Sequence, residues 1–273
     1  MKKLFTVIAA LLMVVTLSAA NLAGKRIYVN PGHGSFGPND RPMATIPYPN
    51  LSSTGMPDTC GFYESNTNLW KCLYLRDRLV AAGAIVTMSR EECGPWPYEK
   101  VNGQYPSYSY DDYKSRPDYE AYNKKLSVIC EEVEAGNYDL FISVHSNAAT
   151  DGSAANYPLC LYRGHDESQG GTSDFETTCR NIWKTIWPWR QEMFLSDFEY
   201  ESSYKTSTNI RGDIDFYGSS SSYTPASGIK YTGYLGVLKH GAVGGLVEGY
   251  FHTYQPARHR ALNHDYCKME GYA

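Results

Sequence analysis

The sequence lacks the features that mark several large protein classes. It has no internal run of about 18 apolar residues, so we expect no membrane span after the N-terminal segment. Lys and Arg number 25 against 29 Asp and Glu, and this near balance argues against nucleic acid as the main partner, because phosphate binding needs a basic surface. No CxxC, HExxH, GxSxG or glycine-rich phosphate loop occurs, so common thiol, zinc-helix, serine-hydrolase and nucleotide motifs have no support.

The composition that remains is that of a globular protein. The 273 residues are 42% hydrophobic and 20% charged, which excludes a disordered chain and allows one large domain or two small ones. Tyrosine is unusually abundant, with 24 Tyr against 9 Phe. Because tyrosine is apolar in its ring and polar at its tip, this abundance predicts broad amphipathic surfaces and extended loops.

The N-terminus has the pattern of a secretory signal peptide. Lys2 and Lys3 supply positive charge, an apolar stretch follows from 4 to 17, and small residues at 18–20 suit cleavage. A buried N-terminal helix is the alternative. We therefore expect a signal peptide at 1–20, a catalytic domain at 21–273 and a periplasmic or secreted protein.

Seven cysteines follow this segment, and an exported chain can oxidise them. The odd number leaves at least one without an intramolecular partner, and spacing alone does not give the pairing. Cys72 and Cys130 fall on the apolar faces of predicted helices, where we expect small buried thiols.

Strand-like and helical patterns alternate along the rest of the chain. We expect strands at 26–30, 84–88, 140–144, 159–162 and 243–247. Helices are expected at 65–82, 117–135, 174–187 and 256–272, and a helical turn at 234–240. Pro188 should end the third helix, and the last should continue beyond residue 273 in a longer chain. Residues 35–61, 94–115 and 196–232 are expected to form long loops. The alternation predicts one α/β domain whose parallel or mixed sheet is covered on both faces.

Polar side chains stand at the ends of three predicted strands. His33 comes soon after the first, His145 follows the central one, and Glu248 follows the last. Ligands of open α/β sheets bind at this carboxyl edge, and a helix packed on the sheet would bring Glu64 to it. Two imidazoles and a carboxylate are the ligand set of a catalytic zinc site, and a second carboxylate can act as general base.

Each of these residues also has a purely structural interpretation. A histidine after a strand often only hydrogen-bonds a turn, and a glutamate at a helix start is favoured by the helix dipole. Glu248 is harder to explain in this way, because it interrupts an apolar run and burying an unpaired carboxylate is costly. Spacing alone leaves both interpretations open.

Four motifs occur in order along the chain: N-P-G-H-G at 30–34, E-S-N-T-N-L-W at 64–70, S-V-H-S-N-A at 143–148 and L-V-E-G-Y-F at 246–251. Together they resemble the zinc-dependent N-acetylmuramoyl-L-alanine amidase family in its amidase-3 form. Two further features support the resemblance: a strand that ends in Arg90, and the presence of Arg116 and Asn123 before the central strand. It extends from about residue 25 to residue 273, with breaks at the long loops.

The resemblance implies a fold, a cofactor and a reaction. The fold would be α/β, a single twisted, mostly parallel sheet of about six strands with helices on both faces and long loop insertions. His33, Glu64 and His145 would bind Zn²⁺, and Glu248 would be the catalytic glutamate. The substrate would be the amide that joins N-acetylmuramic acid to L-alanine in peptidoglycan. Asn147 is a candidate substrate-binding residue, with stabilisation of the turn after the strand as the alternative.

The chain also departs from the family pattern. Asn30 stands where the family usually has Asp, so the support of the metal site is expected to differ. The segment between His33 and Glu64 is longer than usual. Two other functions remain open: a zinc peptidase that cuts within the stem peptide, and an inactive peptidoglycan-binding module, against which the presence of Glu248 argues. The sequence specifies neither the stem-peptide preference nor the oligomeric state.

Overall fold

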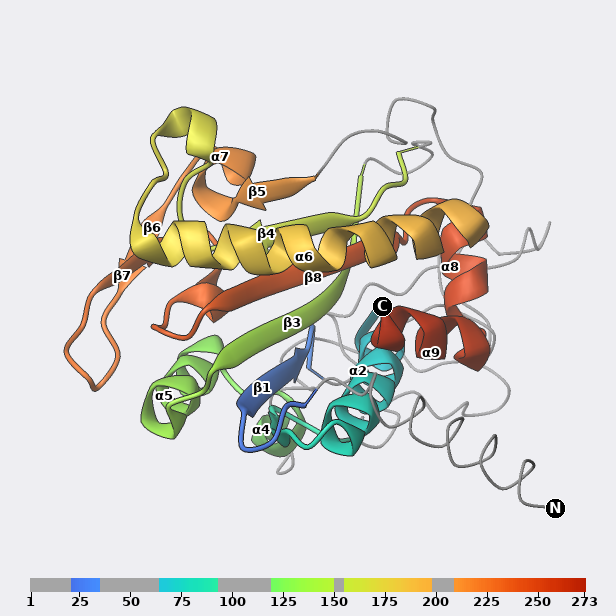
Figure 1. The fold of residues 1–273 in the computed structure, drawn as a ribbon, viewed down its shortest axis with the longest axis horizontal. Helices are drawn as coiled ribbons and strands as arrows, with labels where there is room; N and C mark the ends of the chain where they lie inside the picture. The colour runs from blue at the N-terminus through green and yellow to red at the C-terminus, as the bar shows by residue number, and fades with distance from the viewer. Residues whose placement is uncertain (1–20, 35–63, 93–118, 150–154, 198–208) are drawn as a thin grey trace, which may run out of the picture.

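The computed structural model describes residues 21–34, 64–92, 119–149, 155–197 and 209–273 (Figure 1). The expected signal peptide at 1–20 and the expected loops at 35–61 and 94–115 lie outside these residues. The elements of the first half are β1 (Arg26–Pro31), α2 (Glu64–Ala81), β2 (Ile85–Met88), α4 (Tyr119–Tyr122), α5 (Leu126–Gly136), β3 (Leu140–Asn147) and β4 (Leu159–Tyr162). Those of the second half are η1 (Glu167–Gln169), α6 (Asp174–Asp197), β5 (Ile210–Gly212), α7 (Asp213–Tyr217), β6 (Ser221–Tyr223), β7 (Tyr231–Gly233), η3 (Gly236–Leu238), β8 (Gly244–Phe251), α8 (Gln255–Ala261) and α9 (His264–Tyr272).

Six strands form one mostly parallel sheet in the order β2-β1-β3-β8-β4-β5. β2, β1, β3 and β8 are mutually parallel, whereas β4 pairs with β8 in the antiparallel direction and β5 runs parallel to β4. The carboxyl ends of β1, β3 and β8 therefore meet at one edge, and those of β4 and β5 point to the other. The predicted α/β fold with a mostly parallel sheet of about six strands is confirmed.

Helices cover both faces of the sheet, as predicted. One face packs against α2 and α6 through a core that includes Leu69, Cys72, Trp183 and Trp187. The opposite face packs against α5 and η3 through a second core that includes Ile129, Val133, Val237 and Leu238. None of the helices in the described ranges is long and apolar enough to cross a membrane.

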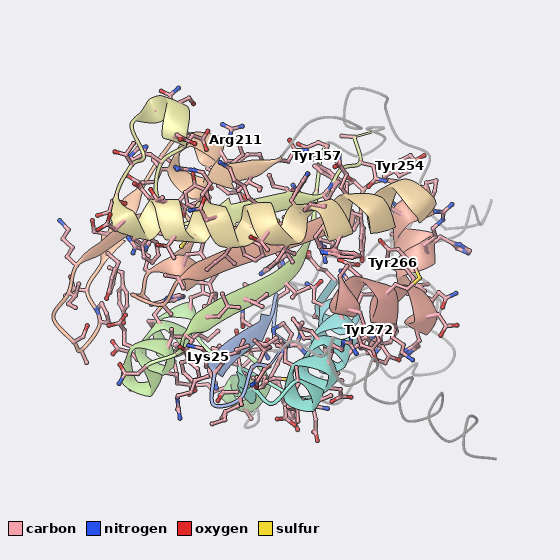
Figure 2. All side chains as sticks on the ribbon, viewed as in Figure 1. Lys25, Tyr157, Arg211, Tyr254, Tyr266 and Tyr272 are labelled. Atoms are coloured by element: carbon pink, nitrogen blue, oxygen red, sulfur yellow. The ribbon has the colours of Figure 1, made fainter. Side chains whose placement is uncertain are left out.

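The C-terminal helices close the end of the molecule at which β1, β3 and β8 finish. In Figure 2, Tyr254, Tyr266 and Tyr272 lie at this end, far from Lys25, which precedes β1. Helix α9 packs against α2 and brings the carboxylate of Glu270 into the interior. There Glu270 Oε1 lies 3.4 Å from Lys71 Nζ and 3.2 Å from Arg190 Nη2. All three side chains are buried, and the single carboxylate of Glu270 is shared by two cations.

Two expectations for helices are wrong at their ends. α6 passes through Pro188 and continues to Asp197, although proline removes a backbone hydrogen bond from a helix interior. Trp187 and Arg190, on either side of the proline, are both buried, so tertiary packing keeps the helix together. The helix expected at 117–135 is instead two helices, because the backbone is extended at Lys125.

Two further expectations are corrected in the second half of the chain. The described part of the segment 196–232 contains β5, α7, β6 and the start of β7 rather than a featureless loop. The closing helix expected at 256–272 breaks after α8, and α9 restarts where the Asn263 side chain accepts a hydrogen bond from the backbone N–H of Asp265.

All five cysteines in the described ranges are buried and none forms a disulfide: Cys72, Cys130, Cys160, Cys179 and Cys267. The prediction of small buried thiols at Cys72 and Cys130 is confirmed. Burial raises the pKa of Cys72 to about 12, so this thiol is neutral and inert at physiological pH.

Candidate metal centre

Two strands and one helix bring three polar side chains to the same edge of the sheet. His33 follows β1 by two residues, His145 lies near the end of β3, and Glu64 is the first residue of α2. One ligand atom of each lies within 4.8 Å of the others. Across the described ranges, this is the one group of three or more His, Cys, Asp or Glu side chains that meets as a metal site would require.

Glu64 is the centre of this cluster. Its side chain is 1% exposed, with Oε2 lying 3.2 Å from His33 Nε2 and Oε1 lying 3.5 Å from His145 Nδ1. Oε1 also accepts a 2.9 Å hydrogen bond from the backbone N–H of Ser146, whereas the buried Oε2 has no hydrogen bond. A buried polar atom without a hydrogen bond is unusual in a native protein and calls for an explanation, such as an ion.

The turn after β1 holds His33 in an uncommon backbone conformation. His33 has φ 65°, which non-glycine residues seldom adopt. At the preceding Gly32, a Cβ atom would collide with the imidazole of His145, so this position requires glycine. Arg90, at the end of the neighbouring strand, donates hydrogen bonds to the carbonyl oxygens of Gly32 (3.2 Å) and Ser65 (2.7 Å). Arg90 thereby connects the turn that carries His33 to the first turn of α2, which carries Glu64.

Asn30 supports the strands beneath the site. Its side-chain amide donates to Ser143 Oγ at 2.8 Å, and its carbonyl oxygen accepts from Ser89 Oγ at 2.6 Å. These two hydrogen bonds connect β1 with Ser143 on β3 and with Ser89, which follows β2.

Glu248 lies on β8, in register with His145 on β3. The prediction that it follows the last strand is wrong in detail, because β8 continues to Phe251 and Glu248 lies inside it. Its side chain is on the sheet face that carries Leu246, the same face on which His145 lies by strand alternation. It is 6% exposed, and Oε2 has no hydrogen bond. Burial raises the pKa of Glu248 well above its ordinary range, and the nearby charge of Glu64 raises it further.

His252 belongs to the same cluster and was missed by the sequence analysis. Its ring is buried, and Nδ1 lies 3.7 Å from Glu64 Oε2 and 3.1 Å from the carbonyl oxygen of Ser146. Nδ1 also lies 3.0 Å from Ser146 Oγ, so both the hydroxyl and the carbonyl oxygen of Ser146 hold the His252 ring in place. One feature of the sequence could have indicated His252: it comes four residues after Glu248. That position faces the site only if the strand continues past Glu248.

The charges of the cluster depend on one another. Burial opposes ionisation of Glu64, but His33, His145 and His252 outweigh it and hold the pKa of Glu64 below its ordinary range. Burial lowers the pKa of His145 and favours a neutral ring, against the opposing effect of Glu64. Neutral imidazoles and an ionised carboxylate are the forms that bind Zn²⁺, so the donor set fits this cation.

Asn147 ends β3 beside the cluster. Its side-chain oxygen accepts a 2.8 Å hydrogen bond from the backbone N–H of Ala148, which stabilises the turn after the strand. A role for Asn147 in substrate binding stays a prediction.

A cleft of about 470 Å³ opens at the cluster. His33, His145 and Leu246 of β8 line it. Residues of α4, the start of α5 and residues 235–237 also line it, and α5 packs against the segment that contains residues 235–237. The cleft therefore gives a ligand access to the two histidines from the sheet face that α5 covers.

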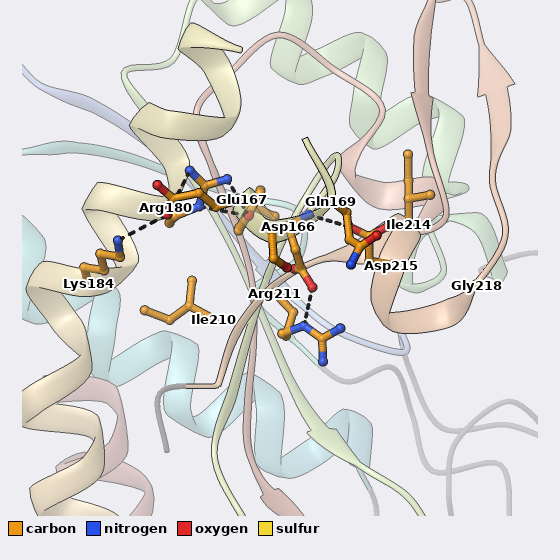
Figure 3. A pocket seen from close by; sticks show the side chains of 12 residues that line it. Asp166, Glu167, Gln169, Arg180, Lys184, Ile210, Arg211, Ile214, Asp215 and Gly218 are labelled. Atoms are coloured by element: carbon orange, nitrogen blue, oxygen red, sulfur yellow. Dashed lines mark hydrogen bonds and ion pairs between the residues drawn. The ribbon is translucent and has the colours of Figure 1, made fainter. Parts of the chain in front are cut away.

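A larger cavity, of about 960 Å³, lies at the opposite edge of the sheet, where β4 and β5 end (Figure 3). Its charged side chains pair with each other: Arg211 Nε lies 2.6 Å from Asp166 Oδ2, and Glu167 faces both Arg180 and Lys184 at 3.7 and 3.8 Å (Figure 3). The size of this cavity does not indicate a reactive site, since its charges already have partners.

The comparison with solved structures supports the fold. No family model matches the sequence, and no curated protein matches it. Solved structures do match. The CwlD amidase from Clostridioides difficile, in complex with the GerS lipoprotein, has a TM-score of 0.52 at 16% identity, covering 91% of this chain and 93% of that one.

Two more solved structures are similar. An N-acetylmuramoyl-L-alanine amidase from Clostridium difficile 630 has a TM-score of 0.52 at 14% identity, covering 91% of each chain. Cwp6 from Clostridium difficile has a TM-score of 0.51 at 19% identity and covers 91% of this chain but 28% of that one. The chain thus has the fold of N-acetylmuramoyl-L-alanine amidases, as the motifs predicted.

Proposed function

We propose that this chain is a zinc-dependent N-acetylmuramoyl-L-alanine amidase. It would hydrolyse the amide between the lactyl group of N-acetylmuramic acid and L-alanine of the peptidoglycan stem peptide. The observation that carries the proposal is the buried His33–Glu64–His145 cluster, with Glu248 in register beside it on the next strand. The amidase fold supports it independently.

His33, Glu64 and His145 are the proposed ligands of Zn²⁺. When bound, zinc lowers the pKa of water to roughly 7 and polarises carbonyl groups. The fit rests on this chain's own atoms: two imidazole nitrogens, and a carboxylate whose buried Oε2 has no hydrogen bond. A cation at this point would also offset the repulsion between the Glu64 and Glu248 carboxylates.

Glu248 is the proposed proton-transfer group, through Oε2. It accepts a proton from the attacking water as the water oxygen bonds to the lactyl carbonyl carbon. As the carbon–nitrogen bond breaks, Glu248 returns the proton to the alanine nitrogen, which is a poor leaving group unless protonated. The products are a free lactyl carboxylate on the sugar and a stem peptide with a free amino terminus. Asn147 is proposed to contact the substrate at the end of β3.

The substrate determines the compartment that we propose. Peptidoglycan lies outside the plasma membrane, and the pattern at 1–20 is that of a signal peptide. We therefore propose a secreted or periplasmic enzyme with residues 21–273 as its catalytic domain.

Product analysis on purified peptidoglycan, with and without a chelator, tests this function. We expect intact stem peptides that begin with free L-alanine, and no release in the presence of the chelator. Free amino groups inside the stem peptide would indicate a zinc peptidase instead. Binding without any product from a zinc-loaded chain would indicate an inactive binding module.

A further inference from the structure

Two tyrosine rings stack on each other on the sheet face on which the cleft opens. They are Tyr217 of α7 and Tyr234, which follows β7. Their ring centroids are 4.0 Å apart and their planes differ by 15°. The two residues are 37% and 41% exposed, so flat aromatic surface reaches solvent here. Exposed aromatic surface of this kind often marks a binding site.

Both rings are close to the candidate metal centre. Tyr234 directly precedes residues 235–237, which line the cleft together with His33 and His145. Burial raises the pKa of Tyr217, and the next largest cause is the charge of Glu248. The Tyr217 side chain therefore lies within electrostatic range of the proposed proton-transfer group.

One buried carboxylate connects the two segments that carry the rings. Asp213 begins α7, the short helix that carries Tyr217, and it is fully buried. Its Oδ2 accepts hydrogen bonds from the backbone N–H groups of Tyr234 and Leu235, both at 2.9 Å. Phe216, next to Tyr217, packs against the core on this face of the sheet. The backbone of both segments is thus positioned before any ligand arrives, which lowers the entropic cost of binding.

We propose that Tyr217 and Tyr234 form a sugar-binding platform, which stacks against a pyranose ring of the glycan strand on the muramic acid side of the scissile amide. This proposal rests on the proposed amidase function. One face of a pyranose ring presents C–H groups that pack on an aromatic ring, and tyrosine adds a polar hydroxyl at the rim.

The lining of the cleft supports this orientation. Residues 235–237 line it next to the aromatic pair, and Asn123 and Lys124, which pairs with Glu132 at 2.8 Å, line it at the start of α5. A substrate with a sugar on one side of an amide and a peptide on the other can place its sugar at the aromatic pair and its peptide along the polar part of the cleft.

The test measures binding of a peptide-free tetrasaccharide of alternating N-acetylglucosamine and N-acetylmuramic acid to the full chain by calorimetry. The tetrasaccharide has no scissile amide, so this binding is independent of turnover. Tyr234→Leu and Tyr217→Leu each keep an apolar side chain but remove the flat ring. We expect each to weaken binding about tenfold and to raise KM on peptidoglycan with little change in kcat.

Three controls separate stacking from other effects. Tyr234→Phe and Tyr217→Phe should keep binding, because the ring is retained. Trp189→Ala removes a ring that is 66% exposed on α6, on the other side of the sheet, and should leave binding unchanged. Thermal midpoints recorded on every variant identify any that fail to fold.

The outcomes distinguish this proposal from the proposed function. If the chain hydrolyses peptidoglycan but the folded leucine variants bind the tetrasaccharide as wild type does, the platform is wrong and the amidase function stands. If the chain shows no hydrolysis but the leucine variants alone lose binding, the platform is supported and the amidase function fails.

Discussion

A histidine lies beside a carboxylate at each edge of the sheet, and the pKa of the histidine shifts in opposite directions at the two edges. At the edge where β1, β3 and β8 end, Glu64 is 1% exposed and faces His33 and His145. At the other edge, His165 and Asp215 form a 2.9 Å pair in which the histidine side chain is 47% exposed. Burial lowers the pKa of His145, whereas the hydrogen bond that His165 donates to Asp215 raises the pKa of His165.

The difference shows how burial determines what such a cluster can do. The exposed pair neutralises itself by holding a proton on His165, and water solvates the rest. In the buried cluster, burial favours a neutral His145 ring beside the ionised Glu64, and it raises the pKa of Glu248 well above its ordinary range. A divalent cation at Glu64 would balance that carboxylate and help Glu248 to ionise, so the buried edge is suited to metal chemistry and the exposed edge to structure.

The largest effect is expected when His33 of the buried cluster and His165 of the exposed pair are each replaced by alanine. His33→Ala should remove stoichiometric zinc and activity, because it deletes a proposed ligand. Its matched control, His165→Ala, should keep both. Loss of an outer partner of a metal ligand typically costs about 10–100-fold in metal affinity, and loss of a ligand should cost more. Metal analysis and turnover on both purified variants test this contrast, and full zinc in His33→Ala would mean that His33 is not a ligand.

Glu248→Gln should separate proton transfer from metal binding at the buried edge. The amide has nearly the same shape but no basic oxygen, so we expect turnover to fall by about 10²- to 10⁴-fold with zinc retained. Stability should hold or rise, because the change removes a buried carboxylate. Turnover, zinc content and thermal midpoint are measured on one sample. A variant that loses zinc would make Glu248 a ligand and reopen the assignment of Glu64.

His240 adds a third kind of histidine to the comparison. It is buried, and no carboxylate is among the causes of its pKa shift. Burial beside Phe141 lowers its pKa to about 3, whereas the unfolded value is about 6.5. Between these values the unfolded chain takes up the proton and the folded chain does not, so stability falls as the pH falls through this window. The loss has a maximum slope of about 1.4 kcal/mol per pH unit.

Denaturant unfolding of wild type and His240→Gln from pH 7 to pH 4 measures this slope. Glutamine does not titrate, so the variant should lose less stability over the same interval. Parallel curves for the two proteins would show that His240 is not protonated on unfolding.

The smallest effect is expected at the exposed pair. Asp215→Asn should lower the pKa of His165 towards its ordinary value, because the hydrogen bond from His165 to the Asp215 carboxylate is the largest cause of its rise. The stabilisation by this pair is present below the unfolded pKa of about 6.5 and is lost as pH rises through the folded pKa. Solvent screening should limit it to less than about 1 kcal/mol. An NMR titration of His165 in both proteins gives the shift, and an unchanged pKa would show that the pair does not form in solution.

The sequence was sufficient to predict the sheet and the meeting of the proposed ligands. Polar residues after parallel strands must converge at one edge, so His33 and His145 were expected together, and α2 packing on the sheet brought Glu64 to them. Glu248 was expected at this edge too, although it lies inside β8 rather than after it. These are consequences of local pattern and register, which a sequence carries directly.

Other features depended on packing between distant segments, which local pattern does not contain. The continuation of α6 through Pro188 rests on the burial of residues on both sides of it. His252 joined the cluster because β8 is longer than its apolar run suggested. Tyr217 lies in the segment expected to be a loop at 196–232, and Tyr234 begins the helical turn expected at 234–240. The elements around them, α7 and β7, are too short to produce a clear period.

The most direct test of the central claim is anomalous diffraction at the zinc edge from crystals of the zinc-loaded full chain. The account predicts one strong peak between the side chains of His33, Glu64 and His145, and none in the cavity beside Asp166 and Arg211. A peak at any other position, or no peak at the cluster when the protein in solution binds one zinc per chain, would contradict it.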